Sequence, residues 1–255
     1  AQARVCYLAL PAGHEAPPFI EALIAWCEGE AAPREPWMAK LDELDRPAAL
    51  QIFIGAECPH CPQAVRVATR AALDSPQVRA TVIDAQRFPQ LAKRFGVRAV
   101  PTTIIDDGLA VTGVLSGAAL VGRLLARGED GYEADRFRSL IETGRLAEAA
   151  RELSHAAGVG FFMQAWRESA TSSRVGLLLV AEQALETERA ALDQLISALC
   201  ELLESDDAAL RGDTADLLGR IGHTDAREAL TRLGADPNPD VAEIAVEVLE
   251  ELDRS

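Results

Sequence analysis

The stretch "IFIGAECPHCPQAV" (residues 52–65) decides how this chain is interpreted. It places Cys58 and Cys61 three residues apart, with Pro59 and His60 between them, after an apolar run and before a helical pattern. The spacing fits either half of a zinc site or the reactive pair of a thiol-disulfide enzyme. The rest of the chain must supply the zinc ligands or the redox fold.

The remaining cysteines and histidines do not complete a metal site by spacing, since a zinc half-site needs two further ligands close together. They are solitary along the chain: Cys6, Cys27, Cys200, His14, His155 and His223. Five cysteines are an odd, sparse set that does not fit a secreted disulfide framework. The sequence therefore favours a redox pair and no bound metal. We expect Cys6 and Cys27 as buried thiols rather than a disulfide, and Cys200 in a core.

Sparse cysteines also fit a reducing compartment, so we expect a cytoplasmic protein. No basic start followed by an apolar core and a cleavage site is visible, and no apolar run approaches the ~20 residues of a membrane span. The chain begins at Ala1 rather than at Met, so a removed leader and a periplasmic location stay open.

Strand and helix patterns alternate around the cysteine pair. The expected strands are 49–55, 78–85, 102–106 and 109–115, and the expected helices are 60–73, 89–96 and 117–127. The turn "DDG" (106–108) joins the last two strands as a hairpin. This order predicts an α/β domain with a mixed sheet and helices on both faces.

The order of elements, "CPHC" (58–61) at the first helix and "VP" (100–101) before the third strand resemble the thioredoxin fold. "CPHCPQAV" and "FGVRAVPTTII" are most similar to the archaeal-type protein disulfide oxidoreductases and to the N-terminal domain of the flavoprotein subunit of alkyl hydroperoxide reductase. The resemblance covers about residues 47–128, and the 43 residues between Cys58 and Pro101 make it specific. It implies a cis bond between Val100 and Pro101, which would hold an extended substrate backbone beside the sulfurs.

The residue types around the pair favour a reactive thiolate at Cys58. A helix N-terminus carries partial positive charge and unpaired N–H groups, and Cys58 is expected where that helix begins. Pro59 suits the first helical position. His60 either adds a partly cationic neighbour that would tune the thiolate or is only a solvated side chain. Cys61, one turn later, is expected to resolve the mixed disulfide.

One position departs from the resemblance. In thioredoxins an acid lies on the preceding strand, six residues before the first cysteine, and assists proton transfer; here that position is Ile52. Glu57 is the only adjacent acid and should point to solvent. "CPHC" also resembles the tetrapeptide of periplasmic dithiol oxidases, but their inserted helical domain is absent. The proton acceptor is therefore left unassigned.

Residues 1–46 contain an expected strand at 4–10 and an amphipathic helix at 18–29. The two relatives carry two thioredoxin-like units in tandem, and the active pair here resembles the second. Residues 1–46 are about half of a full unit. We interpret them as a degenerate or truncated thioredoxin-like unit, or as an added strand and helix.

The second half of the chain contains only helical patterns. The expected helices are 135–143, 146–156, 160–170, 173–186, 189–204, 207–221, 224–233 and 239–252. Residues 210–221 align with 241–252 at a period of 31, which is similar to the HEAT family of helical repeats. We expect a HEAT-like solenoid over 131–255 and a core cluster of Phe161, Phe162 and Trp166.

The balance of charge changes where the strand patterns end. Residues 47–128 carry 9 basic and 5 acidic side chains, whereas residues 129–255 carry 12 and 27. With "ARGEDGYEAD" (126–135) as a polar linker, this predicts a domain boundary near 128–131. The net charge of −15 argues against nucleic acid as a partner.

These patterns predict a thiol-disulfide oxidoreductase with a helical-repeat adaptor for a protein disulfide or dithiol partner. The exchange needs no cofactor, and no Gly-rich dinucleotide signature follows a strand. Electrons would come from a separate reductase or a dithiol partner. The alternative is a non-catalytic docking or assembly protein that uses the thioredoxin fold as a recognition platform.

Overall fold

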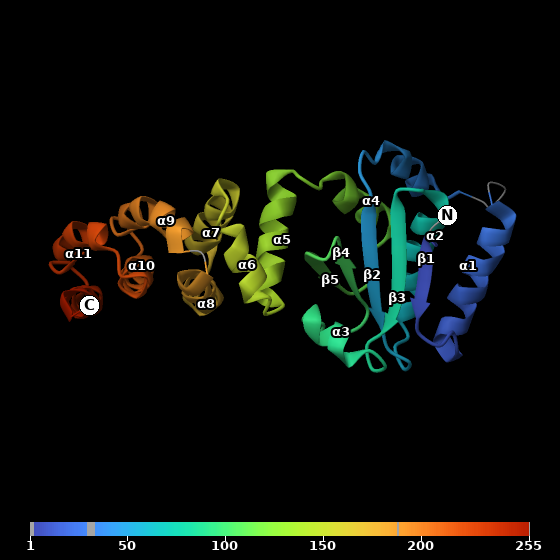
Figure 1. Ribbon diagram of the computed structural model, residues 1–255, viewed down its shortest axis with the longest axis horizontal. Coiled ribbons are helices and arrows are strands. Elements are labelled where there is room, and N and C mark those ends of the chain that lie inside the picture. The colour runs from blue at the N-terminus through green and yellow to red at the C-terminus, as the bar shows by residue number, and fades with distance from the viewer. Residues whose placement is uncertain (1–2, 30–33, 188, 255) are drawn as a thin grey trace. The chain divides into compact units, whose positions relative to one another are not determined.

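The structure is a computed structural model that describes residues 3–29, 34–187 and 189–254 (Figure 1). Its contacts divide the chain into two compact units, Ala1–Thr143 and Gly144–Ser255. The first unit is α/β and the second is helical. Within the described ranges, no helix is long and apolar enough to cross a membrane.

The first unit is built on a five-stranded mixed sheet in the order β1-β3-β2-β4-β5. Its strands are β1 (Val5–Leu8), β2 (Ala48–Ile54), β3 (Val78–Asp84), β4 (Thr102–Ile105) and β5 (Leu109–Thr112). β1, β3 and β2 are parallel, and β4 and β5 pair antiparallel. Leu8, Ile83 and Phe53 stand in one row across the parallel strands. The carboxyl ends of β1 and β2 therefore lie at the same end of the sheet, where the parallel strands finish.

One face of this sheet is covered by α2 (Cys61–Asp74), α4 (Gly117–Leu125) and the 3-10 helix η3 (Pro36–Glu43). Their side chains pack on alternate residues of β2 and β3, which face one side because strand side chains have a period of two. The opposite face carries α3 (Pro89–Arg94) over a smaller cluster around Phe53. The expected mixed sheet with helices on both faces is confirmed, whereas η3 was not predicted, because its short turn shows little periodicity.

The hairpin between β4 and β5 has the turn that its sequence predicts. Asp106 and Asp107 have φ of 48° and 58°, and the N–H of Gly108 donates to the carbonyl of Ile105 at 3.0 Å. Positive φ at both central residues is the requirement of the tight turn that matches strand twist.

Residues 1–46 join the same sheet rather than forming a sheet of their own. β1 pairs with β3, and α1 (Ala16–Glu28) packs on α2. In the described residues they are an added strand and helix of one compact unit. Their interpretation as the remains of a first thioredoxin-like unit stays a prediction.

The division between the units lies between Thr143 and Gly144, later than the boundary expected at 128–131. The reason is α5 (Asp130–Glu142), which packs on β5. Ser139 Oγ accepts a hydrogen bond from the N–H of Ala110 at 2.8 Å, and a Cβ at Gly96 would overlap the carbonyl oxygen of Thr143. The expected linker over 126–135 is therefore wrong: most of it is ordered helix of the first unit.

The second unit stacks helices in two alternating rows. They are α6 (Leu146–Glu152), α7 (Ala156–Glu168), α8 (Thr171–Thr187), α9 (Arg189–Leu202), α10 (Ala208–Ile221), α11 (Arg227–Leu233) and α12 (Pro239–Arg254). α6, α8, α10 and α12 contact one another in sequence, and α7 contacts α9. The segments related by the period of 31 are the neighbouring helices α10 and α12. This is the stacking expected of HEAT-like repeats.

Buried hydrogen bonds and an ion pair join the helices of these rows. Trp166 is fully buried, stacks on Phe162 and donates from Nε1 to Thr214 Oγ1 at 3.0 Å. Arg174 donates to Asp213 at 2.6 Å and to the carbonyl of Trp166 at 3.0 Å. The core role expected for Phe162 and Trp166 is confirmed, whereas Phe161 is half-buried.

Candidate functional site

The cysteine pair lies where β2 gives way to α2. The chain leaves β2 at Ile54, and the N–H of Cys58 donates to the carbonyl of Gly55 at 3.1 Å. α2 begins at Cys61 with His60 as its N-cap. The helix therefore starts later than expected: Cys58 lies in the turn before it, and Pro62 rather than Pro59 occupies its first turn.

Cys58 and Cys61 form a disulfide with a Cα–Cα distance of 5.5 Å, within the range that such bridges need. Cys61 is fully buried and Cys58 is half-buried. The N–H of Cys61 points at Cys58 Sγ across 3.2 Å. This is one of the free donors at a helix start, so it stabilises negative charge on the more accessible sulfur.

Val100 and Pro101 lie against the pair. Their peptide bond is cis, as the resemblance implied, and Cys58 Sγ lies 3.7 Å from the carbonyl oxygen of Val100. A Cβ at Gly55 would come within 3.2 Å of Val100 Cγ2, so glycine there lets the two loops approach. The carbonyl of Pro101 is already used by the N–H of Gly113 at 2.8 Å.

His60, Pro59 and Glu57 are exposed, and His60 makes no side-chain hydrogen bond to the helix. Glu57 points to solvent as expected. The tuning roles of His60 and Pro59 stay predictions. The structure thus brings the expected site residues together at one sheet edge, while it leaves the chemistry of the exposed ones untested.

Glu15 is a buried acid that sequence reasoning missed. It ends the short helix η1 (Gly13–Glu15), which follows β1 and contacts α2. The residue is 3% exposed, and neither carboxylate oxygen has a hydrogen-bond partner. Burial raises the pKa of this carboxyl, which the charges of Arg66 and His14 partly oppose.

Two observations make Glu15 relevant to the pair. Ile52 occupies the position at which thioredoxins carry an acid, and it is fully buried in the apolar core. Glu15 follows the carboxyl end of β1, which shares its sheet edge with the carboxyl end of β2. The acid at this edge therefore comes from a different strand connection. An acid just before a proline-containing helix start is usually an exposed N-terminal charge, so only the topology indicates that it is buried.

The other cysteines correct two expectations. Cys6 and Cys27 are exposed and free, not buried, because Cys6 lies on an edge strand and Cys27 on the outer side of α1. Cys200 is half-buried, and burial raises the pKa of its thiol. Among the side chains that the structure describes, no group of three His, Cys, Asp or Glu residues could hold a metal ion.

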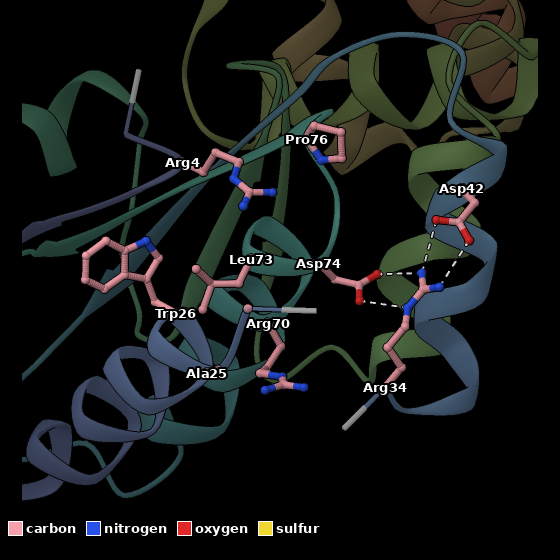
Figure 2. Close-up of a pocket in the computed structure, with 10 residues that line it drawn as sticks. Arg4, Ala25, Trp26, Arg34, Asp42, Arg70, Leu73, Asp74 and Pro76 are labelled. Carbon is pink, nitrogen blue, oxygen red and sulfur yellow. Dashed lines mark hydrogen bonds and ion pairs between the residues drawn. The ribbon is translucent and has the colours of Figure 1, made fainter. Parts of the chain in front are cut away.

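The cavity in Figure 2 is not part of this site. Its volume is about 630 Å³, and Arg4, Gly29 and Asp74 line it at the end of α1 and α2 away from the cysteines. Arg34 fills one side through ion pairs with Asp42 at 3.1 Å and Asp74 at 2.7 Å. The cavity lies at the end of α2 opposite to Cys61, so it does not serve the cysteine pair.

Comparison with known proteins agrees with this geometry. The thioredoxin domain family matches residues 48–125, and the HEAT repeat family matches residues 181–255. The thioredoxin of Methanocaldococcus jannaschii is 34% identical over 79 residues, which are 31% of this chain and 93% of that protein. The chain therefore belongs to the thioredoxin family through this domain, and HEAT-like repeats follow it.

Two solved structures are also similar. The NTD_N/C domain of alkylhydroperoxide reductase AhpF from Enterococcus faecalis is 26% identical with a TM-score of 0.43, covering 46% of this chain and 56% of that chain. A protein disulfide oxidoreductase from Aeropyrum pernix is 24% identical with a TM-score of 0.43, covering 48% and 55%. This chain thus spans just over half the length of each.

Proposed function

We propose that the protein is a thiol-disulfide oxidoreductase that exchanges electrons with a protein partner through Cys58 and Cys61. The observation that carries this proposal is the setting of Cys58 Sγ. This sulfur is half-buried, receives the N–H of Cys61 and lies 3.7 Å from the carbonyl of Val100. It can therefore be reached, and its negative charge is stabilised where it would form.

In the reducing direction, the Cys58 thiolate attacks one sulfur of a partner disulfide. A mixed disulfide forms, and the other partner sulfur leaves as a thiolate. The Cys61 thiol then loses its proton and attacks Cys58 Sγ, which closes the Cys58–Cys61 bond and releases the partner as a dithiol. Two electrons pass to the partner, and a separate dithiol reductase restores the pair. No bound cofactor takes part in these steps.

We assign to Glu15 the proton that Cys61 must lose. Cys61 is buried, so bulk water does not reach its thiol readily. Glu15 is a buried carboxylate without a hydrogen-bond partner, and it follows the carboxyl end of β1, two strands along the sheet from the end of β2. A raised pKa brings such a group closer to the thiol that it must deprotonate, which improves proton transfer.

Val100 and Pro101 are assigned to substrate positioning. Arg98 and Ala99 before them are exposed, so an extended chain can lie beside this segment and reach Cys58. The HEAT-like unit is assigned to partner binding, since helical repeats present extended surfaces and this half of the chain carries the acidic excess. A partner with a basic face fits that charge.

The test is capture of partners by a Cys61→Ser variant, in which the mixed disulfide cannot be resolved. The matched control is Cys58→Ser, which keeps one thiol of the pair but removes the nucleophile. We expect reducible adducts with Cys61→Ser only. Equal, non-reducible capture by both variants would instead favour the docking protein without redox chemistry.

The adaptor role is tested separately by deleting 144–255 from the Cys61→Ser variant. Capture of protein partners should weaken, and the reduction of a small disulfide peptide by the otherwise unmodified deletion should be nearly unchanged. If charge guides the partner, capture by the full chain should also fall with salt, because exposed charges are screened over ~10 Å at 0.1 M. Equal capture with and without the repeats, at low and high salt, would contradict the adaptor role.

A further inference from the structure

Helix α1 has two apolar faces, of which the first unit buries only one. Pro18, Ala22 and Ala25 are its buried residues, and the helix packs on α2. The outer side carries Ile20, Leu23 and Ile24, which are 53%, 45% and 52% exposed. A helix that is apolar all round is normally buried all round. The outer side of α1 therefore lacks a partner within this unit.

The neighbouring strand is also incomplete. β1 lies at the edge of the sheet and, within the described part of the chain, pairs with β3 alone. Its other edge leaves backbone N–H and C=O groups available to a further strand, which proteins usually protect. Figure 1 shows α1 alongside β1 at this margin of the sheet.

A groove of about 570 Å³ runs between the strand and the helix. Val5, Tyr7, Phe19, Leu23 and Trp26 line it with apolar surface. Trp26 is 67% exposed, and Figure 2 shows its indole at the margin of the adjoining cavity. The free edge, the groove and the outer side of α1 thus form one continuous surface, which we call the β1–α1 surface.

We infer that the β1–α1 surface is a dimer interface between two copies of this chain. A two-fold axis perpendicular to the sheet would pair β1 antiparallel with β1 of the second copy. The same axis places both α1 helices on one face of the joined sheet, so that their outer sides meet. A second copy thus satisfies the strand edge and the helix together, which is the self-complementarity that a two-fold interface requires.

The size of the surface supports a stable dimer. Four of the exposed large apolar side chains lie on it: Ile20, Leu23, Ile24 and Trp26. At on the order of 100 Å² each, they expose about 400 Å², within the range of the largest apolar patches on monomers. Two copies would bury about 800 Å² from these side chains alone, and strand pairing and the groove residues add more, toward the ~1,200 Å² at the lower end of stable interfaces.

The test is sedimentation of the full chain under reducing conditions, at concentrations from about 1 to 100 μM. Ile24→Glu places a charge in the middle of the surface without touching the core, and Leu179→Glu is the matched control, since Leu179 is 43% exposed on α8. We expect dimers for the unmodified chain and the control, and at least a tenfold weaker association for Ile24→Glu. Monomers throughout, or dimers that Ile24→Glu leaves unchanged, would overturn the inference.

Strand pairing has its own readout. Cys6 is exposed on β1, so a short bismaleimide should join two copies through Cys6 in a variant in which every other cysteine is serine. Adding Ile24→Glu should abolish that cross-link. Failure of the unmodified surface to cross-link while the chain is dimeric would overturn the antiparallel pairing of β1. Binding of a different protein to a monomeric chain through this surface would overturn the inference of a dimer.

Discussion

The backbone N–H of Cys61 donates to Cys58 Sγ across 3.2 Å, at the point where α2 begins. The two residues therefore have different roles although they share one disulfide. The helix start stabilises negative charge on the sulfur of Cys58, whereas Cys61 has a buried sulfur and supplies the donor through its backbone N–H. An asymmetric pair of this kind has one entry point for a partner.

The first prediction concerns the acidity of Cys58. In the reduced protein its thiol pKa should lie below the ~8.5 of free cysteine, because the Cys61 N–H stabilises the thiolate. The rate of iodoacetamide alkylation against pH, measured in Cys61→Ser, would give this midpoint. Cys27→Ser and Cys6→Ser in the same background remove the exposed competing thiols. A midpoint at or above the free value would contradict the assignment of Cys58 as nucleophile.

The second prediction concerns His60. His60 is exposed beside Cys58, and we predict that its imidazole favours the thiolate form. His60→Gly should therefore make the couple more reducing, by on the order of 30 mV, which is about 1.4 kcal/mol for two electrons. Equilibration with glutathione buffers measures the shift, and His155→Gly serves as a distant control. An unchanged potential would show that His60 is only a solvated side chain.

The third prediction concerns Glu15, whose folded-state pKa is raised by burial. A raised pKa means that the folded state binds the proton more tightly than the unfolded state. The carboxyl therefore favours folding below its unfolded pKa, and this contribution is lost as pH rises through the folded pKa. Glu15→Gln should raise stability at neutral pH by on the order of 1 kcal/mol, since an unpaired buried charge costs more than an unpaired amide.

Urea unfolding at a series of pH values measures this difference, which should shrink toward acid pH. The same variant should release mixed disulfides more slowly, because Cys61 loses its proton acceptor. Glu21→Gln is the control, since Glu21 is exposed and paired with Arg66 at 2.7 Å. Unchanged release by Glu15→Gln would remove Glu15 from the mechanism while leaving its effect on stability intact.

The fourth prediction concerns Arg127, whose side chain is 4% exposed. It donates to Asp106 at 2.7 Å and to the carbonyls of Pro47 at 2.6 Å and Arg46 at 2.9 Å. Arg127→Met leaves these partly exposed acceptors without their buried donor and should destabilise the first unit by about 2 kcal/mol. Arg123→Met is the control, because Arg123 is more exposed and its ion pair with Asp135 is 3.8 Å long. Similar urea midpoints for both variants would contradict this anchoring role.

The fifth prediction concerns the boundary between the units. A fragment of residues 1–143 should fold and reduce a disulfide peptide, whereas residues 1–128 should be less stable, because Phe137 and Leu140 of α5 are buried in the first unit. Residues 144–255 should be wholly helical by circular dichroism. Equal thermal stability of the two N-terminal fragments would show that α5 adds nothing to the first unit.

The sequence by itself determined the local elements and the reacting pair. Local patterns depend on neighbours a few positions away: the short apolar run of 49–55, the β-branched residues of 78–85, the "DDG" turn and the helical stripe after Cys61. The two cysteines and the proline at 101 could therefore be assigned to one site through the spacing that the resemblance supplies. The repeat of 31 residues likewise predicts stacked helices, since its period is visible in the chain.

Only the tertiary structure decided which polar groups are buried and where the first unit ends. Glu15, Arg127 and Cys6 look like ordinary residues of connections and strands. Glu15 and Arg127 are buried and Cys6 is exposed because of elements that are distant in the sequence. Strand order is likewise non-local: β1 meets β3 across about 70 residues of chain, by parallel pairing that no short pattern encodes. Burial and sheet order are set by long-range packing, so they emerge only when the chain has folded.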